Sequence, residues 1–222
     1  ADTSHYGEPC RGRGEVLIRG PSVSSGYFKQ PEKTQEVYDM EGWFHSGDVG
    51  IILPDGALML VDRMKNLVKL KGGEYIALEA MEKEYVSSAW VDGISGGVLC
   101  YGDGEMDRPV ALVQVNTTAL TKWAKEAGIG GDIEKLCKEP AAQKVVLDSL
   151  LSAGKAGSLS ALELLFAVAL LPGSGPAAGE PTAASPWTPE NGCLTASNKL
   201  DRKRIQAACA SVLDPLRAKA AR

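Results

Sequence analysis

The chain has 222 residues, of which 44% are hydrophobic, enough to build one large or two small globular cores. Its 24 basic and 28 acidic residues give a formal net charge of −4, so the overall charge does not indicate a nucleic-acid-binding protein. The five cysteines are scattered, without a C-x-x-C spacing or a histidine cluster. They predict neither a zinc site nor a disulfide framework, and they favour a reducing, intracellular setting.

The first sixty residues predict a short β-rich stretch. Strands are expected at 14–19 and, on either side of the tight turn Pro54-Asp55-Gly56, at 49–53 and 57–61. A short helix is expected from Pro31 to about Tyr38. The chain opens without an initiating Met or a signal-type apolar stretch, so we expect it to be a fragment of a longer protein.

Beyond residue 64 the pattern changes to short strands that alternate with helices. Strands are expected at 97–101 and 110–115, one helix ends at Gly128, and another runs from Pro140 to about Ser152 with Val146, Leu147, Leu150 and Leu151 facing inward. An earlier helix carries a mostly apolar stripe made of Leu78, Met81, Glu82, Tyr85 and Val86. The apolar run at 159–171 is too short to span a membrane and predicts a buried strand or helix. These elements suffice for a small α+β domain.

The last fifty residues hold a loop and a basic tail. The segment 172–189 is rich in Pro, Gly and Ala, and we expect it to be flexible and unable to build a core. The tail from Lys199 to Arg222 has seven Lys or Arg residues and two Asp residues. It could meet an anionic ligand such as a phosphate, or it could be the solvated face of a terminal helix.

Three polar motifs follow one another in order: 43–48 (Trp-Phe-His-Ser-Gly-Asp), 62–76 (Asp-Arg-Met-Lys-Asn-Leu-Val-Lys-Leu-Lys-Gly-Gly-Glu-Tyr-Ile) and 190–202 (Glu-Asn-Gly-Cys-Leu-Thr-Ala-Ser-Asn-Lys-Leu-Asp-Arg). Together with Gly-Glu-Val-Leu-Ile-Arg-Gly at 14–20, they resemble the rear part of the adenylate-forming superfamily of acyl-CoA synthetases, luciferases and peptide-synthetase adenylation domains. The second and third motifs resemble the long-chain fatty acid branch of that superfamily. The implied fold class is α+β. Residues 1–62 would form the C-terminal end of a large, β-rich nucleotide-binding domain, and a hinge would join them to a small, mobile lid domain at 63–222.

The resemblance implies an AMP-forming long-chain fatty acid:CoA ligase. Such an enzyme converts fatty acid, ATP and CoA into acyl-CoA, AMP and pyrophosphate through an acyl-adenylate. The phosphate-binding loop, the Mg²⁺ ligands and the acyl tunnel of the family have no counterpart here and are expected upstream, so we expect no metal ligand in this chain and no turnover by the isolated 222 residues. Two alternatives stay open: a non-catalytic nucleotide-binding or interaction module, and a superfamily member acting on a different carboxylic acid.

The resemblance also implies a cellular setting. The partners would be the three substrates alone, with no nucleic acid and no transmembrane segment in this chain. The protein would be intracellular, either cytoplasmic or associated with a membrane such as the endoplasmic reticulum or peroxisome face, and the longer protein could bind the membrane peripherally.

The resemblance assigns roles to individual residues. Asp48, expected at the start of a strand, matches the aspartate that holds the ribose hydroxyls of ATP, while His45 is expected to be a turn residue only. Lys65 matches the hinge residue about which the small domain swings, and it also comes near the nucleotide. The other residues implied on this segment are Arg63 and Lys69 for the phosphates, Gly72 and Gly73 for the CoA pantetheine, and Tyr75 for the nucleotide pocket.

Lys199 is the implied catalytic residue. In the family, the lysine of this late loop enters the active site and bridges the acyl carboxylate and the α-phosphate, where its charge stabilises the forming acyl-adenylate. This sequence departs from the family just before that lysine, because Ala196-Ser197-Asn198 replaces the more usual Pro-Thr-x.

Overall fold

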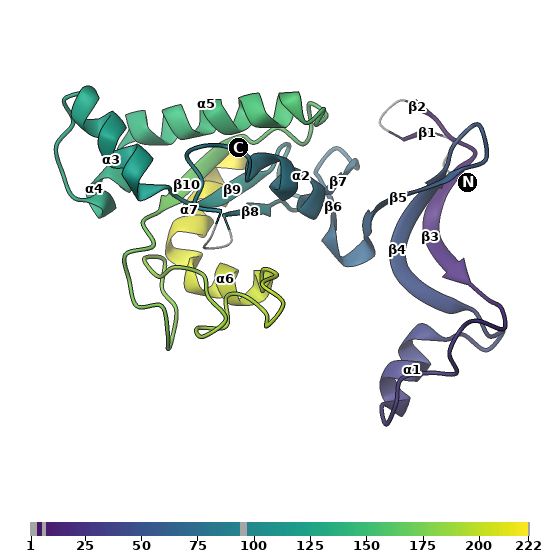
Figure 1. The fold of residues 1–222 in the computed structure, drawn as a ribbon. Coiled ribbons are helices and arrows are strands. Elements are labelled where there is room, and N and C mark those ends of the chain that lie inside the picture. The colour runs from purple at the N-terminus through teal and green to yellow at the C-terminus, as the bar shows by residue number, and fades with distance from the viewer. Residues whose placement is uncertain (1–3, 6–7, 94–96, 222) are drawn as a thin grey trace. The chain divides into compact units, whose positions relative to one another are not determined.

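The chain folds into two compact units that divide between Leu67 and Val68. The structure, a computed structural model, describes residues 4–5, 8–93 and 97–221 (Figure 1). The division falls within the polar segment in which the sequence places a hinge.

The first unit is built on a three-stranded antiparallel sheet in the order β3-β4-β5. The chain reverses between β4 and β5 at the expected turn, where the Gly56 N–H donates to the Leu53 carbonyl (2.9 Å) and the Leu53 N–H donates to the Ala57 carbonyl (2.9 Å). These bonds confirm the hairpin predicted from Pro54-Asp55-Gly56. The elements of this unit are β1 (Ser4–His5), β2 (Glu8–Pro9), β3 (Gly12–Ile18), α1 (Pro31–Val37), β4 (Phe44–Ile52), β5 (Leu58–Arg63) and the 3₁₀ helix η1 (Met64–Asn66).

Much of the apolar surface of the first unit is exposed. Among the described residues, ten of the thirteen exposed large hydrophobic side chains belong to this unit, and Leu58, Met59 and Leu60 are exposed together on the edge strand β5. Val49 and Ile51 of the central strand are buried. A three-stranded sheet with so small a core needs a further apolar layer for stability.

The second unit is an α+β domain around a three-stranded sheet in the order β10-β9-β8. β8 and β9 are antiparallel, whereas β9 and β10 are parallel and are joined by a helical crossover. A separate two-stranded hairpin, β6-β7, precedes the sheet in sequence. The elements are β6 (Leu67–Lys69), β7 (Tyr75–Ala77), α2 (Leu78–Tyr85), β8 (Val98–Tyr101), β9 (Val110–Gln114), α3 (Thr117–Glu126), α4 (Ile133–Lys138), α5 (Pro140–Ala156), β10 (Ala167–Leu171), α6 (Arg202–Ala208) and α7 (Ala210–Ala220).

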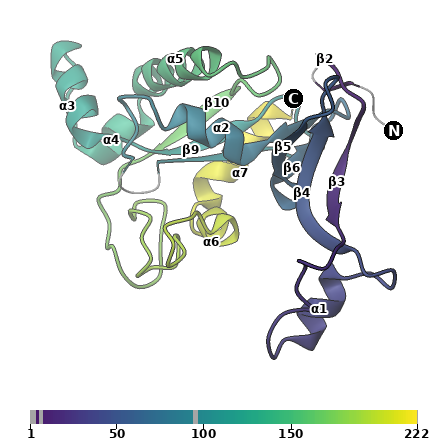
Figure 2. The ribbon, with the colours of Figure 1, turned by 45° about the vertical axis from the view of Figure 1, so that its right-hand side comes forward.

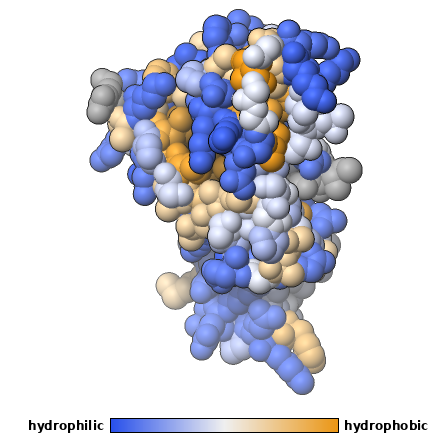
Figure 3. Space-filling view, turned by 90° about the vertical axis from the view of Figure 1, so that its left-hand side faces the viewer, coloured by the Kyte–Doolittle hydropathy of each residue, from blue (hydrophilic) through white to orange (hydrophobic). Residues whose placement is uncertain are grey.

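Both faces of this sheet are buried. Val98 and Cys100 of β8 pack on the side of α2 and α5, and Leu99, between them, packs with Leu213 of α7 on the opposite side. Figures 1 and 2 show α2 and α5 on one side of the sheet and α6 on the other. The sheet therefore lies between two layers of buried side chains. The one face of the molecule drawn in Figure 3 has hydrophobic side chains lying between hydrophilic ones.

Local signals explain where the helices begin and end. The side chains of Asn116 and Asp132 accept hydrogen bonds from backbone N–H groups in the first turns of α3 and α4 (3.1 and 2.9 Å), as helix-capping residues do. Pro140 starts α5, and Gly128, with φ +70°, follows α3 as predicted. The helix α5 continues to Ala156, four residues beyond the predicted end.

Two expectations for the second unit were wrong. Val86 is exposed because α2 ends at Tyr85, so the apolar stripe does not continue to residue 86. The segment 172–189 does contribute to a core, because Trp187 is 1% exposed and packs against Leu171, Cys209 and neighbouring side chains. The Gln114 side chain also donates to the Ser185 carbonyl (3.1 Å), which ties this segment to β9.

Candidate functional site

Asp48 and Arg63 face each other on paired strands. They are opposite residues of β4 and β5, and the Arg63 Nε lies 3.3 Å from the Asp48 Oδ1. Both side chains stay partly exposed, at 32% for Asp48 and 56% for Arg63. An ion pair this exposed is weak, so the carboxylate remains accessible to a ligand hydroxyl. Asp48 lies in the middle of β4, not at a strand start as predicted, because the strand already begins at Phe44.

His45 is a strand residue held by two carboxylates, not the turn residue that was predicted. Its Nδ1 lies 2.9 Å from the Glu15 Oε2, and its Nε2 lies 3.6 Å from the Asp39 Oδ2. The hydrogen bond to Glu15 raises the pKa of His45 above its ordinary value. Glu15 also accepts from the Gly47 N–H (3.0 Å). Glu15 thereby fixes the segment that leads into Asp48.

Lys65 lies in a turn that its neighbours hold in place. The Asp62 Oδ1 accepts from the Arg63 N–H (2.6 Å) and from the Asn66 side-chain amide (3.0 Å). Asn66 is 2% exposed, whereas Lys65 is exposed within the single 3₁₀ turn η1. Lys65 is thus an exposed cation next to a buried, hydrogen-bonded residue.

The predicted residues from Lys69 to Tyr75 come together in the β6-β7 hairpin. The turn is closed by hydrogen bonds from the Gly73 N–H to the Leu70 carbonyl (2.9 Å) and from the Leu70 N–H to the Glu74 carbonyl (2.8 Å). Gly73 adopts φ +88°, which strains any side chain, so glycine is required there. The Lys69 Nζ lies 5.9 Å from the centre of the Tyr75 ring. Lys69 is exposed and the next side chain, Leu70, is buried.

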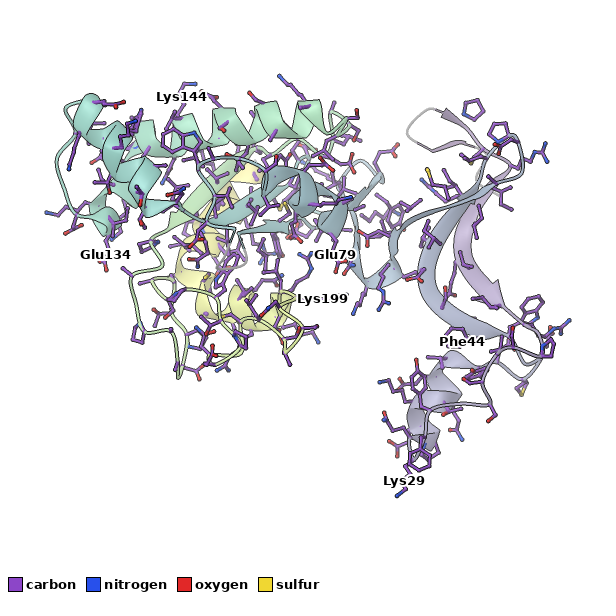
Figure 4. The ribbon with its side chains drawn as sticks, viewed as in Figure 1. Lys29, Phe44, Glu79, Glu134, Lys144 and Lys199 are labelled. Carbon is purple, nitrogen blue, oxygen red and sulfur yellow. The ribbon has the colours of Figure 1, made fainter. Side chains whose placement is uncertain are left out.

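A tight turn presents Lys199 to solvent. The Thr195 N–H donates to the Lys199 carbonyl (2.8 Å), and the Thr195 Oγ1 accepts from the Lys199 N–H (3.1 Å). A β-bridge between Leu194 and Leu200 closes the base of the turn. Asn198 has φ +57°, a left-handed conformation that asparagine tolerates. Figure 4 shows Lys199 on this loop ahead of α6.

The predicted site residues thus fall into separate groups. Asp48 and Arg63 form one pair in the first unit, and the glycine hairpin and the Lys199 turn belong to the second. Within the described residues, no group of three or more His, Cys, Asp or Glu side chains could hold a metal ion. None of the described helices is long and apolar enough to cross a membrane.

One site feature was not predicted, namely the ion pair between Glu82 and Arg202. The Arg202 Nη2 lies 2.6 Å from the Glu82 Oε2, and the Nη1 lies 2.8 Å from the Oε1. Burial raises the pKa of Glu82 to about 7, although Arg202 and the Cys100 amide both favour the charged form. A signal was present in the sequence, because Glu82 is the single charged residue in the apolar stripe of α2.

Comparison with known proteins shows which proteins the chain is similar to. No model of a known protein family matches the chain. Long chain acyl-CoA synthetase 8 of Arabidopsis thaliana is 41% identical over 200 residues, which cover 88% of this chain and 26% of the relative. The chain is a relative of the long-chain acyl-CoA synthetases. Long-chain-fatty-acid–CoA ligase 1 of Schizosaccharomyces pombe is 37% identical over 90% of the chain and 27% of the relative. The chain therefore spans about a quarter of the length of the curated acyl-CoA synthetases it matches.

Solved structures support the fold. The A domain of the carboxylic acid reductase from Segniliparus rugosus, solved with AMP and a co-purified carboxylic acid, matches 93% of this chain with a TM-score of 0.70 and 28% identity. The match covers 28% of that domain. The adenylation domain of the carboxylate reductase from Mycobacterium chelonae gives a TM-score of 0.71 at 28% identity. The fold is that of a part of an adenylate-forming domain, as expected from the three sequence motifs.

Proposed function

We propose that this chain is part of an AMP-forming long-chain fatty acid:CoA ligase, which joins fatty acid and CoA at the expense of ATP. The observation that carries the proposal is the identity of 35–41% to long-chain acyl-CoA synthetases along about nine-tenths of the chain. The exposed, rigidly held Lys199 turn and the glycine hairpin agree with it. Residues 1–62 belong to the large nucleotide-binding domain, and residues 63–222 form the mobile domain.

Lys199 acts on the first half-reaction. In that step the acyl carboxylate attacks the α-phosphate of ATP, and pyrophosphate leaves. Negative charge gathers on the reacting oxygens, and the Lys199 ammonium offsets it. A contact of this kind at 4 Å contributes on the order of 4 kcal/mol at an intermediate dielectric. An exposed lysine on a fixed turn can enter such a site without first giving up a partner of its own, and the described residues place no ion-pair partner on Lys199.

The first unit and the hairpin hold the nucleotide and CoA. Asp48 accepts hydrogen bonds from the ribose hydroxyls, and Arg63 and Lys69 offset phosphate charge. Gly72 and Gly73 let the backbone approach the pantetheine of CoA, and Tyr75 borders the nucleotide pocket. Lys65 is the pivot between the adenylating and the thioester-forming positions of the small domain.

The other binding and catalytic residues would lie in the part of a full-length relative that this chain does not span, which is about three quarters of its length. Mg²⁺, the triphosphate and the acyl chain would be bound mainly there, and the isolated 222 residues are not expected to turn over. The exposed apolar side chains of β5 support this division, because they offer a face for the rest of the large domain. The whole protein would act inside the cell, in the cytoplasm or peripherally on an endoplasmic reticulum or peroxisomal membrane. Two of the relatives are named as peroxisomal.

The proposal is tested by ATP–pyrophosphate exchange with the longer protein that carries this chain. Exchange is measured with acids from two to eighteen carbons and with aromatic acids. A rise in exchange with the long saturated acids supports a long-chain ligase. Exchange with a short or aromatic acid alone would show that the protein belongs to another branch of the superfamily, which acts on a different carboxylic acid. If no acid supports exchange, the chain belongs to a non-catalytic module and the proposal fails.

A further inference from the structure

The Glu82–Arg202 pair makes more contacts than those within the pair. The Glu82 Oε1 accepts from the Cys100 N–H (2.7 Å), and the Arg202 Nη1 donates to the Cys100 carbonyl (3.3 Å). The side chains of Glu82 and Arg202 are only 10% and 17% exposed. One residue of β8 therefore has both backbone groups bound by the same ion pair.

This arrangement covers a strand edge. β8 is an outer strand of the three-stranded sheet, so within the described part of the chain the backbone groups on its outer side have no neighbouring strand. An unpaired backbone group that is buried is unfavourable. Glu82 and Arg202 supply the acceptor and the donor that an additional strand would have supplied. Burial by itself would lower the pKa of Arg202, but the hydrogen bond to Glu82 and the Coulombic attraction to that carboxylate together raise it, so the guanidinium stays charged.

The pair also connects the Lys199 turn to the hinge side of the domain. Arg202 is the first residue of α6 and follows Lys199 by three positions. Glu82 lies on α2, which begins at Leu78 directly after the last residue of β7. β7 is the second strand of the hairpin that carries Gly72 and Gly73, the glycines proposed to contact CoA. The ion pair thus links the start of α6, just after Lys199, to α2, which follows the β6-β7 hairpin.

We propose that Arg202 is a positioning residue for Lys199, because its ion pair with Glu82 across the edge of β8 fixes the start of α6 relative to the hinge hairpin. This inference rests on the proposed function of Lys199. When the small domain swings, the turn and the hairpin then move as one body, so that Lys199 arrives at a defined place. Arg202 touches no substrate in this account.

The test compares two arginines of the same helix. Arg202→Met keeps a long side chain but removes the ion pair, whereas Arg204→Met removes the exposed pair with Glu180 (2.8 Å) and a longer hydrogen bond from the Arg204 Nε to the Asn191 carbonyl (3.4 Å). Both variants, together with Lys199→Ala, are made in the full-length enzyme. ATP–pyrophosphate exchange reports adenylation, and thioester formation from supplied acyl-AMP reports the second step. Hydrogen exchange of the Thr195 and Lys199 amides reports the order of the turn.

We expect Arg202→Met to lower adenylation about a hundredfold, as a displacement of roughly 1 Å does, and to leave the second step within about threefold. The Thr195 and Lys199 amides should exchange faster, and Arg204→Met should resemble the wild type. Arg202→Lys keeps the charge and should recover most of the adenylation. If Arg202→Met does not fold, Arg202→Gln, which also lacks the charge, replaces it with the same expected loss of adenylation.

Each outcome bears on one claim. If Lys199→Ala keeps full adenylation, the proposed function of Lys199 is wrong. If Lys199→Ala loses adenylation but Arg202→Met retains it, the positioning role is wrong. Equal losses of both steps in Arg202→Met, with an unchanged Lys199 turn, would show a general structural role and would overturn the inference.

Discussion

Asn198 offers a direct way to disturb the Lys199 turn without touching the lysine. Its φ of +57° is unfavourable for most L-residues by about 1–2 kcal/mol and more so for β-branched ones, whereas glycine adopts it freely. An added cost of about 1.4 kcal/mol lowers the ratio of formed to unformed turn tenfold. Asn198→Val should therefore lower the fraction of molecules with a formed turn by at most about tenfold, and Asn198→Gly should leave it almost unchanged.

The assay is ATP–pyrophosphate exchange by the full-length enzyme, with Ala196→Val as the control. Ala196 is exposed in the same turn, and its φ is not among the positive values. Asn198→Val should exchange more slowly, by up to about tenfold, while Ala196→Val and Asn198→Gly should keep the wild-type rate. Thermal unfolding should change little because the turn is exposed and relaxes locally. A wild-type rate for Asn198→Val would refute the view that this turn must be formed for Lys199 to act.

Three further predictions concern the hinge, the core and the buried carboxylate. Lys65→Pro should impair thioester formation more than adenylation, because a proline ring restricts the φ angle at the pivot; unchanged thioester formation, measured from supplied acyl-AMP, would argue against this pivot. Trp187→Ala should cost about 3–5 kcal/mol in urea unfolding of the chain, since the indole is 1% exposed, whereas Glu180→Ala in the same segment should cost less than about 1 kcal/mol. A small effect of Trp187→Ala would mean that this segment is not part of the core. The pKa of Glu82 is raised to about 7 by burial, so its stabilising contribution is fully present below its unfolded value and is lost as the pH rises through about 7. The stability of the wild type relative to Glu82→Gln should fall between pH 4.5 and pH 7, and a difference independent of pH would contradict this.

Local chemistry made much of the fold predictable. The turn Pro54-Asp55-Gly56 joins two antiparallel strands as expected, and Gly128 follows the end of α3. Pro140 likewise begins α5 as expected. In each case the signal and the structure it determines lie within a few residues of each other.

Long-range packing was not predictable in the same way. Composition alone made 172–189 a flexible loop, but a single large side chain, Trp187, is buried beside residues from distant helices. Arg202 and Glu82 are 120 positions apart, and their pairing depends on how α6 and α2 meet at the edge of β8. His45 has Glu15 and Asp39 as its partners. Whether these carboxylates reach the imidazole depends on the strand register and on the loop before β4. Such contacts are set by the tertiary fold and have no local signature.

The central claim is that Lys199 serves adenylation and not the later transfer to CoA. The most direct measurement compares Lys199→Ala with Lys203→Ala, a neighbouring exposed lysine on α6, in the two separate half-reactions of the full-length enzyme. We expect Lys199→Ala to abolish ATP–pyrophosphate exchange with a long-chain acid and still to form acyl-CoA from supplied acyl-AMP, while Lys203→Ala retains both half-reactions. Equal loss of the two half-reactions in Lys199→Ala, or full exchange by that variant, would contradict it.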